Sequence, residues 1–197
     1  GGYGWFALLM TFFGVGGLAS KYRYEEKLSR GIAQENEGAR DSGNVLANSA
    51  VALVAVVAYA GAVHAGMDAS VFRFAFAGAV AAALADTLSS EFGGLFDNPR
   101  LITTFERVEA GTDGGVTWQG VVAGLAGSGC IAGLGALFFG LGVPSTATIL
   151  AAGVVGMTVD SILGATLEGG RLGNQSVNLL ATLSAGLVAA AAGLTVL

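Results

Sequence analysis

The sequence predicts an all-α integral membrane protein, a bundle of about six transmembrane helices. Apolar residues make up 53% of its 197 residues, the mean hydropathy is +0.69, and 12% of residues are charged, against roughly 25% in a typical soluble domain. Six windows hold the roughly 20 mostly apolar residues that a helix needs to cross a bilayer. The 33 glycines are interspersed with Ala and Ser inside these windows, which is typical of transmembrane helices whose backbones pack closely.

The predicted helices cover residues 3–19, 45–63, 71–90, 120–140, 145–167 and 177–197. An even number of spans places both termini on the same side of the membrane. We treat 1–197 as a single transmembrane domain. The first window lacks a basic n-region and a small-residue cleavage site, so we interpret it as a mature helix rather than a signal peptide. Because the chain starts with Gly1 instead of Met, further helices upstream are left open.

The segments between these helices alternate in character. Segments 20–43, 91–119 and 168–176 are polar and carry eight of the nine Lys and Arg residues, while segments 64–70 and 141–144 are short, and Arg73 alone lies at their face. An excess of basic residues marks the cytoplasmic side, so we expect a cell-membrane protein whose polar loops face the cytoplasm. Segment 20–43 is a predicted amphipathic linker: its Glu25, Glu26, Lys27 and Arg30 suit a short surface helix with i,i+4 pairs, and its simplest interpretation is a solvated linker helix.

Charge and composition exclude several classes of function. The net charge is −5 and no basic stripe is present, so nucleic acid is not an expected partner. The single cysteine, Cys130, lies in an apolar run and can form neither a disulfide framework nor a thiolate metal site. The only histidine, His64, lies at the end of the bundle away from the polar segments. Zinc and haem sites are therefore not expected.

Four polar side chains on four predicted helices are expected at one depth. Asp86 and Asp160 each lie about fifteen residues into a helix that runs toward the cytoplasm, roughly 7 Å below its end. Asn48 and Asn178 lie about one turn inside helices that run the other way. A carboxylate within a span is costly unless it is paired or hydrated, and it marks a functional site by default. An alternative stays open: the two aspartates only form hydrogen bonds across helices or reach interfacial water.

Segment 91–119 is the predicted active-site loop. It contains Glu91, then Arg100, whose guanidinium can bind phosphate oxygens through two hydrogen bonds, and then a Thr-Asp-Gly-Gly run at residues 112–115. Glycine backbone can approach an anion closely, although the same letters form an ordinary turn in many proteins. Carboxylates, a guanidinium and a glycine loop over the mouth of a helix bundle together suggest a magnesium and polyphosphate site.

Five stretches together resemble one known family. They are Val45 to Asn48, Ala85 to Glu91, Pro99 to Thr104, Gly111 to Gly115 and Asp160 to Leu167. They resemble the membrane family of domain of unknown function 92, which contains plant phytyl-phosphate kinase, transmembrane protein 19 and many uncharacterised archaeal and bacterial proteins. The resemblance runs from about Lys21 to Asn178. One departure is Glu168, which stands where relatives often carry Gln.

The resemblance implies a polytopic helical fold and, as in the plant members, transfer of a phosphate from a nucleoside triphosphate, with CTP expected, to a prenyl monophosphate of the phytyl or geranylgeranyl type. Mg²⁺ would be the cofactor, held by Asp86, Glu91 and Asp160, while Asn48 and Asn178 orient these carboxylates. The prenyl tail would lie in the lipid bilayer. No oligomeric state is predicted. Phosphate groups would be bound by Lys21, Arg100, Thr103, Thr112, Asp113, Gly114, Gly115 and Ser161.

Two rival functions are considered. A transporter or flippase of a lipid phosphate or small ion typically binds near the midplane and needs polar groups leading to both faces. The outer half of the predicted bundle is almost without polar residues, which favours an enzyme. A helical scaffold without catalytic activity would leave the shared layer of aspartates and asparagines without a reason.

Overall fold

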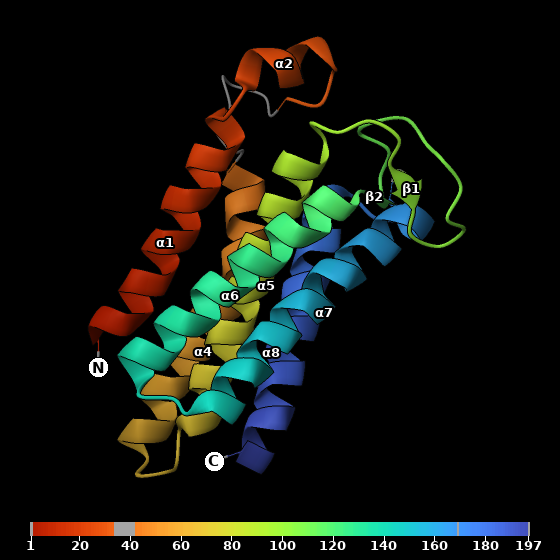
Figure 1. Ribbon diagram of the computed structural model, residues 1–197. Helices are drawn as coiled ribbons and strands as arrows, with labels where there is room; N and C mark the ends of the chain where they lie inside the picture. The colour runs from red at the N-terminus through yellow and green to blue at the C-terminus, as the bar shows by residue number, and fades with distance from the viewer. Residues whose placement is uncertain (1, 34–41, 169, 197) are drawn as a thin grey trace.

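The computed structural model describes residues 2–33, 42–168 and 170–196, and it is a bundle of long helices with a small hairpin at one end (Figure 1). Within the described residues, six helices are long and apolar enough to span a membrane, which confirms the all-α membrane fold. These helices are α1 (Gly2–Lys21), α4 (Ser42–His64), α5 (Ser70–Gly93), α6 (Trp118–Phe139), α7 (Val143–Leu167) and α8 (Asn174–Val196).

Two helices begin earlier than their apolar windows indicate. The first turn of α4 starts at Ser42 and that of α8 at Asn174, each three residues before the predicted start. Ser and Asn suit a helix N-terminus, because their side chains can accept hydrogen bonds from backbone N–H groups that have no partner within the helix. The polar first turns matter for the site, since they extend both helices beyond their apolar stretches.

The polar segments gather at one end of the bundle, which we call the polar end. It carries α2 (Tyr24–Ser29) and a hairpin in which β1 (Arg100–Leu101) pairs antiparallel with β2 (Gly115–Val116). Figure 1 shows both chain termini at the opposite end. Both termini therefore lie on the same side of the bundle, as an even number of spans requires.

Helix α5 forms the centre of the bundle and packs against α1, α4, α6, α7 and α8. Its residues 74–85 are apolar and nearly all buried. Small residues let the neighbours come close: a Cβ added at Gly78 would lie 2.9 Å from the carbonyl oxygen of Ala185, and one at Gly156 would lie 2.9 Å from the Cβ of Ala185. Because the hydrophobic effect does not draw helices together within lipid, close approach of their backbones stabilises the bundle through van der Waals packing.

An aromatic cluster joins α1 to the bundle at the end opposite the polar end. The ring of Trp5 lies 4.9 Å from Tyr59, 4.6 Å from Phe76 and 5.2 Å from Phe139, measured between centroids. Arg73 donates a hydrogen bond of 3.0 Å to the Tyr59 hydroxyl. Arg73, at the end opposite the polar end, is thus held by a tyrosine of the bundle.

Among its described residues, the predicted linker 20–43 contains the short helix α2. Arg30 pairs with Glu26 at 3.1 Å, as the i,i+4 pattern predicts. Lys27 does not belong to the solvated face, because its side chain is 1% exposed and points into the protein. Residues 34–41 of the predicted linker lie outside the described residues. In segment 91–119, α5 continues to Gly93, and Thr117 caps α6 by accepting a hydrogen bond of 3.1 Å from the Gly120 amide.

Candidate functional site

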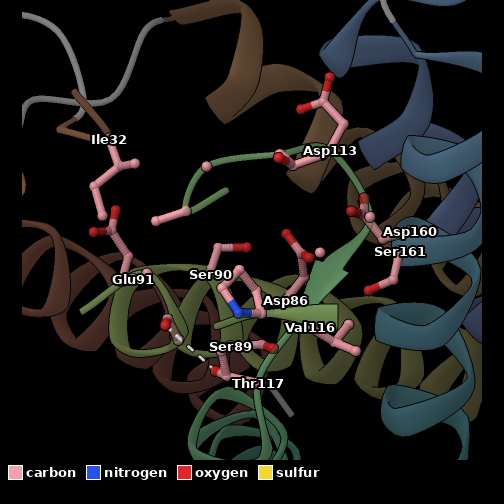
Figure 2. Close-up of a pocket in the computed structure, with 18 of the residues that line it drawn as sticks. Ile32, Asp86, Ser89, Ser90, Glu91, Asp113, Val116, Thr117, Asp160 and Ser161 are labelled. Atoms are coloured by element: carbon pink, nitrogen blue, oxygen red, sulfur yellow. Dashed lines mark hydrogen bonds between the residues drawn. The ribbon is translucent and has the colours of Figure 1, made fainter. Parts of the chain in front are cut away.

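A cavity of about 330 Å³ opens at the polar end, between the ends of α4, α5, α7 and α8 and the loop that contains the hairpin (Figure 2). It is lined mainly by polar side chains and glycine backbone. The predicted site residues among its lining are Asn48, Asp86, Glu91, Thr112, Asp113, Gly114, Gly115, Asp160, Ser161 and Asn178. Residues far apart in the sequence are therefore brought into one space.

The four polar side chains of the helices share a layer because of where they lie along each helix. Asp86 is seven residues before Gly93, and Asp160 is seven residues before Leu167, the last residues of α5 and α7. Asn48 is six residues after the start of α4, and Asn178 is four residues after the start of α8. At 1.5 Å per residue all four lie roughly 6 to 10 Å below the polar end.

Carboxylates dominate one side of the cavity. The side chains of Asp86 and Asp160 interact directly, and Asp113 and Glu168 lie within electrostatic reach of Asp160. Burial, followed by the charges of Asp113 and Asp86, raises the pKa of Glu168 above its ordinary value of 4.5. Like charges held this close create a negative potential, which a cation would relieve.

The asparagines are fixed by the first turns of their own helices. The amide of Asn48 donates to the carbonyl oxygen of Asn44 at 3.0 Å, and the amide of Asn178 donates to the side-chain oxygen of Asn174 at 2.6 Å. Among the described residues, the side-chain oxygen of Asn44 is a buried acceptor without a hydrogen-bond partner, and Asn44 lines the cavity. Carboxylate and amide oxygens that need a cation or a donor are the ligands that Mg²⁺ prefers, so the donor set fits this ion.

Glu91 is separated from the expected metal set. One of its carboxylate oxygens accepts a hydrogen bond of 2.7 Å from Ser20, and the other binds the Lys27 ammonium at 2.6 Å. In the part of the chain that the structure describes, no three His, Cys, Asp or Glu side chains are gathered closely enough to hold a metal ion. Glu91 is therefore neutralised by a buried ammonium, whereas Asp86 and Asp160 interact with each other.

The glycine run is positioned by contact with α7. Gly114 has φ 73°, and a Cβ added there would lie 2.5 Å from both the Ala165 nitrogen and the Ser161 carbonyl oxygen. The loop backbone therefore rests directly on the helix, which carries Asp113 toward Asp160 (Figure 2). The physical use of this glycine is close packing against a helix, in addition to any approach to an anion.

Three predicted phosphate-binding residues do not line the cavity. Lys21 is exposed at the end of α1, and Thr103 is exposed in the connection that follows β1. The guanidinium of Arg100 donates a hydrogen bond of 2.7 Å to the carbonyl oxygen of Phe105. Arg100 thereby stabilises its own turn, and the exposed position of the other two keeps them outside the cavity.

The site also includes residues that the sequence analysis did not assign to it. Ser20 and Lys27 hold Glu91, while Asn44 and Asn174 support the deeper asparagines and also line the cavity. Asn44 and Asn174 each lie four residues before a predicted site asparagine. This repeated Asn-x-x-x-Asn spacing could have identified them, because positions i and i+4 share a helix face. No local pattern signals the pairing of Lys27 with a glutamate 64 residues away.

Similarities to known proteins place the chain in a family. It is 38% identical over 193 residues to "Uncharacterized membrane protein MJ0933" of Methanocaldococcus jannaschii, covering 95% of this chain and 75% of that protein. It is 36% identical over 189 residues to "Protein PGR" of Arabidopsis thaliana, covering 85% of this chain and 65% of the relative. It is 29% identical over 164 residues to "Protein VTE6, chloroplastic" of the same plant, covering 83% of this chain and 49% of the relative.

The chain therefore spans about two thirds of PGR and about half of VTE6. No solved structure matches it. The family described as "Integral membrane protein DUF92" matches residues 1–186, nearly the whole chain. This match confirms the resemblance seen in the sequence motifs: the chain belongs to the DUF92 family of integral membrane proteins.

Proposed function

We propose that this protein is a membrane-embedded isoprenyl-phosphate kinase, which transfers a phosphate from CTP or another nucleoside triphosphate to a phytyl-type or geranylgeranyl-type monophosphate. The observation that carries the proposal is the single cavity in which two aspartates and two asparagines from four helices meet at the polar end of an apolar bundle. The family resembled by the motifs contains plant phytyl-phosphate kinase, and the relatives of this chain include the chloroplastic plant protein VTE6.

The size and position of the cavity suit the phosphate groups of such substrates. About 330 Å³ is at the lower end of the range for small-molecule sites. It accommodates phosphoryl groups but leaves a long prenyl tail outside, where the apolar helix surfaces and the bilayer receive it. The basic residues of the polar segments favour a cytoplasmic location of this end, so the nucleotide would arrive from the cytosol.

In the proposed mechanism, Asp86 and Asp160 would hold a magnesium ion supplied with the nucleotide. Mg²⁺ in such a site neutralises the charge of the transferred phosphoryl group. Asn48 and Asn178 fix the orientation of the two carboxylates, while the Thr112 hydroxyl, which donates to the Glu109 carbonyl oxygen at 2.8 Å, holds the glycine run at the cavity wall. Because Glu91 is already neutralised by Lys27, it supports the wall without binding the ion.

The bond changes balance without a general base. An oxygen of the acceptor monophosphate attacks the γ-phosphorus, and the bond between that phosphorus and the bridging oxygen of the nucleoside diphosphate breaks. The products are a prenyl diphosphate and the nucleoside diphosphate. The attacking oxygen is already anionic near neutral pH, since the second pKa of a phosphate monoester is about 6. Catalysis then depends on positioning and charge neutralisation.

The central helix favours an enzyme over a transporter. Residues 74–85 of α5, which run from the cavity toward the opposite end, carry no polar side chain and are nearly all buried. A transport path through the middle of the bundle would need polar groups or water along this helix.

The direct test uses purified protein in nanodiscs with Mg²⁺, CTP or ATP, and phytyl or geranylgeranyl monophosphate, and detects the prenyl diphosphate by mass spectrometry. We expect product from the wild type and a loss of about 100-fold or more in Asp160→Asn. Asp68→Asn removes an exposed carboxylate between α4 and α5, far from the cavity, and is the matched control. Absence of product with the wild type, or undiminished product after Asp160→Asn, would reject the kinase. Uptake by sealed vesicles without nucleotide consumption would support a transporter.

A further inference from the structure

A buried cluster of Ser20, Lys27 and Glu91 lies at the rim of the cavity, and we call it the Lys27 cluster. The Lys27 ammonium donates to a Glu91 carboxylate oxygen at 2.6 Å and to the Ala19 carbonyl oxygen at 2.7 Å. Ser20 donates to the other Glu91 oxygen at 2.7 Å. The side chains of Lys27 and Glu91 are 1% and 6% exposed. The cluster therefore joins α2 and the end of α1 to the last turn of α5.

This attachment is stronger than the other ion pairs of the same segment. Arg23 pairs with Glu26, and Arg30 pairs with Asp97, through side chains that are partly or fully exposed. Exposed pairs contribute little, because water and salt screen them. A buried, charge-assisted pair holds its geometry firmly, since loss of either partner leaves an uncompensated charge out of water. Lys27 is thus the main ionic attachment of α2 to the bundle among the pairs described.

The segment that follows α2 reaches over the cavity. Ile32 lines the cavity and lies against two glycines of the opposite loop. A Cβ added at Gly94 would be 2.7 Å from the Ile32 Cδ1 atom, and one added at Gly111 would be 2.7 Å from its Cγ2 atom. In Figure 2, Ile32 and Glu91 lie on one side of the cavity, and Asp113 and Asp160 lie on the other. An apolar side chain therefore covers part of a polar rim, directly beside the Lys27 cluster.

We propose that Lys27 is a positioning residue of this cavity: its pairing with Glu91 holds Ile32 against Gly94 and Gly111, and this contact limits the entry of water-soluble ligands. The inference concerns access to the cavity and does not depend on which phosphate compound enters. It therefore stands or fails separately from the proposed kinase activity.

The test measures access without any substrate. In a Cys130→Ala background, Ser161→Cys introduces a reporter thiol on the α7 wall of the cavity, away from the Lys27 cluster. A charged, membrane-impermeant thiol reagent is added to protein in nanodiscs, and the labelling rate is measured. Lys27→Met removes the ammonium, Ile32→Ala removes the covering side chain but leaves the ion pair, and Lys21→Met removes the same charge from the exposed end of α1.

We expect the labelling rate to rise by about tenfold or more in Lys27→Met and in Ile32→Ala, and to stay unchanged in Lys21→Met. Unchanged rates in both of the first two variants would overturn the proposal. A second reporter, Ser128→Cys, lies fully buried against α7. Equal acceleration at this position would mean that the bundle as a whole has loosened, and that result would also count against a role in positioning.

Discussion

Gly114 is a position at which the loop between α5 and α6 lies directly against α7, and its replacement by alanine is a sharp perturbation. The added Cβ would meet the Ala165 nitrogen and the Ser161 carbonyl oxygen at 2.5 Å each, and it would also overlap the Ala165 side chain. Two of these three atoms belong to the backbone of a packed helix and cannot rotate away. The loop itself must therefore move off α7.

The magnitude follows from two costs. The backbone of Gly114 has φ 73°, and this left-handed conformation costs a residue with a side chain about 1 to 2 kcal/mol. Forcing an extra methyl group into a filled space costs about 1 to 3 kcal/mol more. The sum, about 2 to 5 kcal/mol, is expected to appear as easier opening of the loop rather than as unfolding of the whole bundle.

Limited trypsin digestion reports this opening. Arg100 and Arg107 are exposed residues of the loop that pair with each other through a β-bridge, so that cleavage needs local separation. A loss of 2 kcal/mol corresponds to roughly 30-fold faster cleavage at these arginines, and a larger loss to more. The fragments are quantified by mass spectrometry in detergent, where the wild type sets the reference rate.

Two matched glycine variants separate the causes. Gly66 also has positive φ, 71°, but has no atom within 4 Å of an added Cβ, and Gly133 is a helical glycine of α6 with open space around it. Neither Gly66→Ala nor Gly133→Ala should change cleavage at the loop arginines. If Gly114→Ala is cleaved no faster than these two variants, the inferred docking of the loop on α7 is wrong.

Three further predictions concern stability in detergent, measured by thermal unfolding. Lys27→Met leaves the buried Glu91 carboxylate unpaired and should cost about 3 to 5 kcal/mol; a loss no larger than that of Lys21→Met would contradict the buried pair. Arg30→Ala breaks only partly exposed pairs and should stay within about 1 kcal/mol of the wild type, so a large loss would show that α2 is held differently. The folded-state pKa of Glu168 is raised above 4.5 by burial and by neighbouring carboxylates, so its stabilising contribution is present below pH 4.5 and is lost as the pH rises through the folded-state pKa. Glu168→Gln should therefore unfold at a higher temperature than the wild type at neutral pH and should converge with it below pH 4.5; a difference independent of pH would refute this assignment.

The helices and the depth of the polar layer could be predicted because both depend on local, regular geometry. Apolar windows of sufficient length define spans, and a fixed rise per residue converts a position such as Asp86 or Asn178 into a depth. Because successive helices cross the membrane in opposite directions, the ends of α5 and α7 lie at the same side as the starts of α4 and α8. The cavity observed at the polar end gathers residues from all four of these helices.

The partners of individual side chains could not be predicted, because they depend on contacts between distant segments. The spacing of charges in segment 20–43 correctly indicated the pair of Arg30 with Glu26 but gave no sign that Lys27 points inward. A glycine-rich sequence can form a turn, bind an anion or pack closely against a helix. The contact of Gly114 with α7 depends on where α7 lies, which the sequence of the loop does not indicate. Arg100 looked like a phosphate ligand, yet its guanidinium binds the carbonyl oxygen of Phe105.

We propose that Asp86 and Asp160 form one site for a divalent cation that arrives with a nucleotide. The most direct measurement is a titration of the purified protein with Mn²⁺ in the presence and absence of CTP, followed by electron paramagnetic resonance of the free ion. We expect one Mn²⁺ bound per chain when CTP is present, and loss of this binding in both Asp86→Asn and Asp160→Asn. Mn²⁺ binding that persists undiminished in both variants would contradict the account.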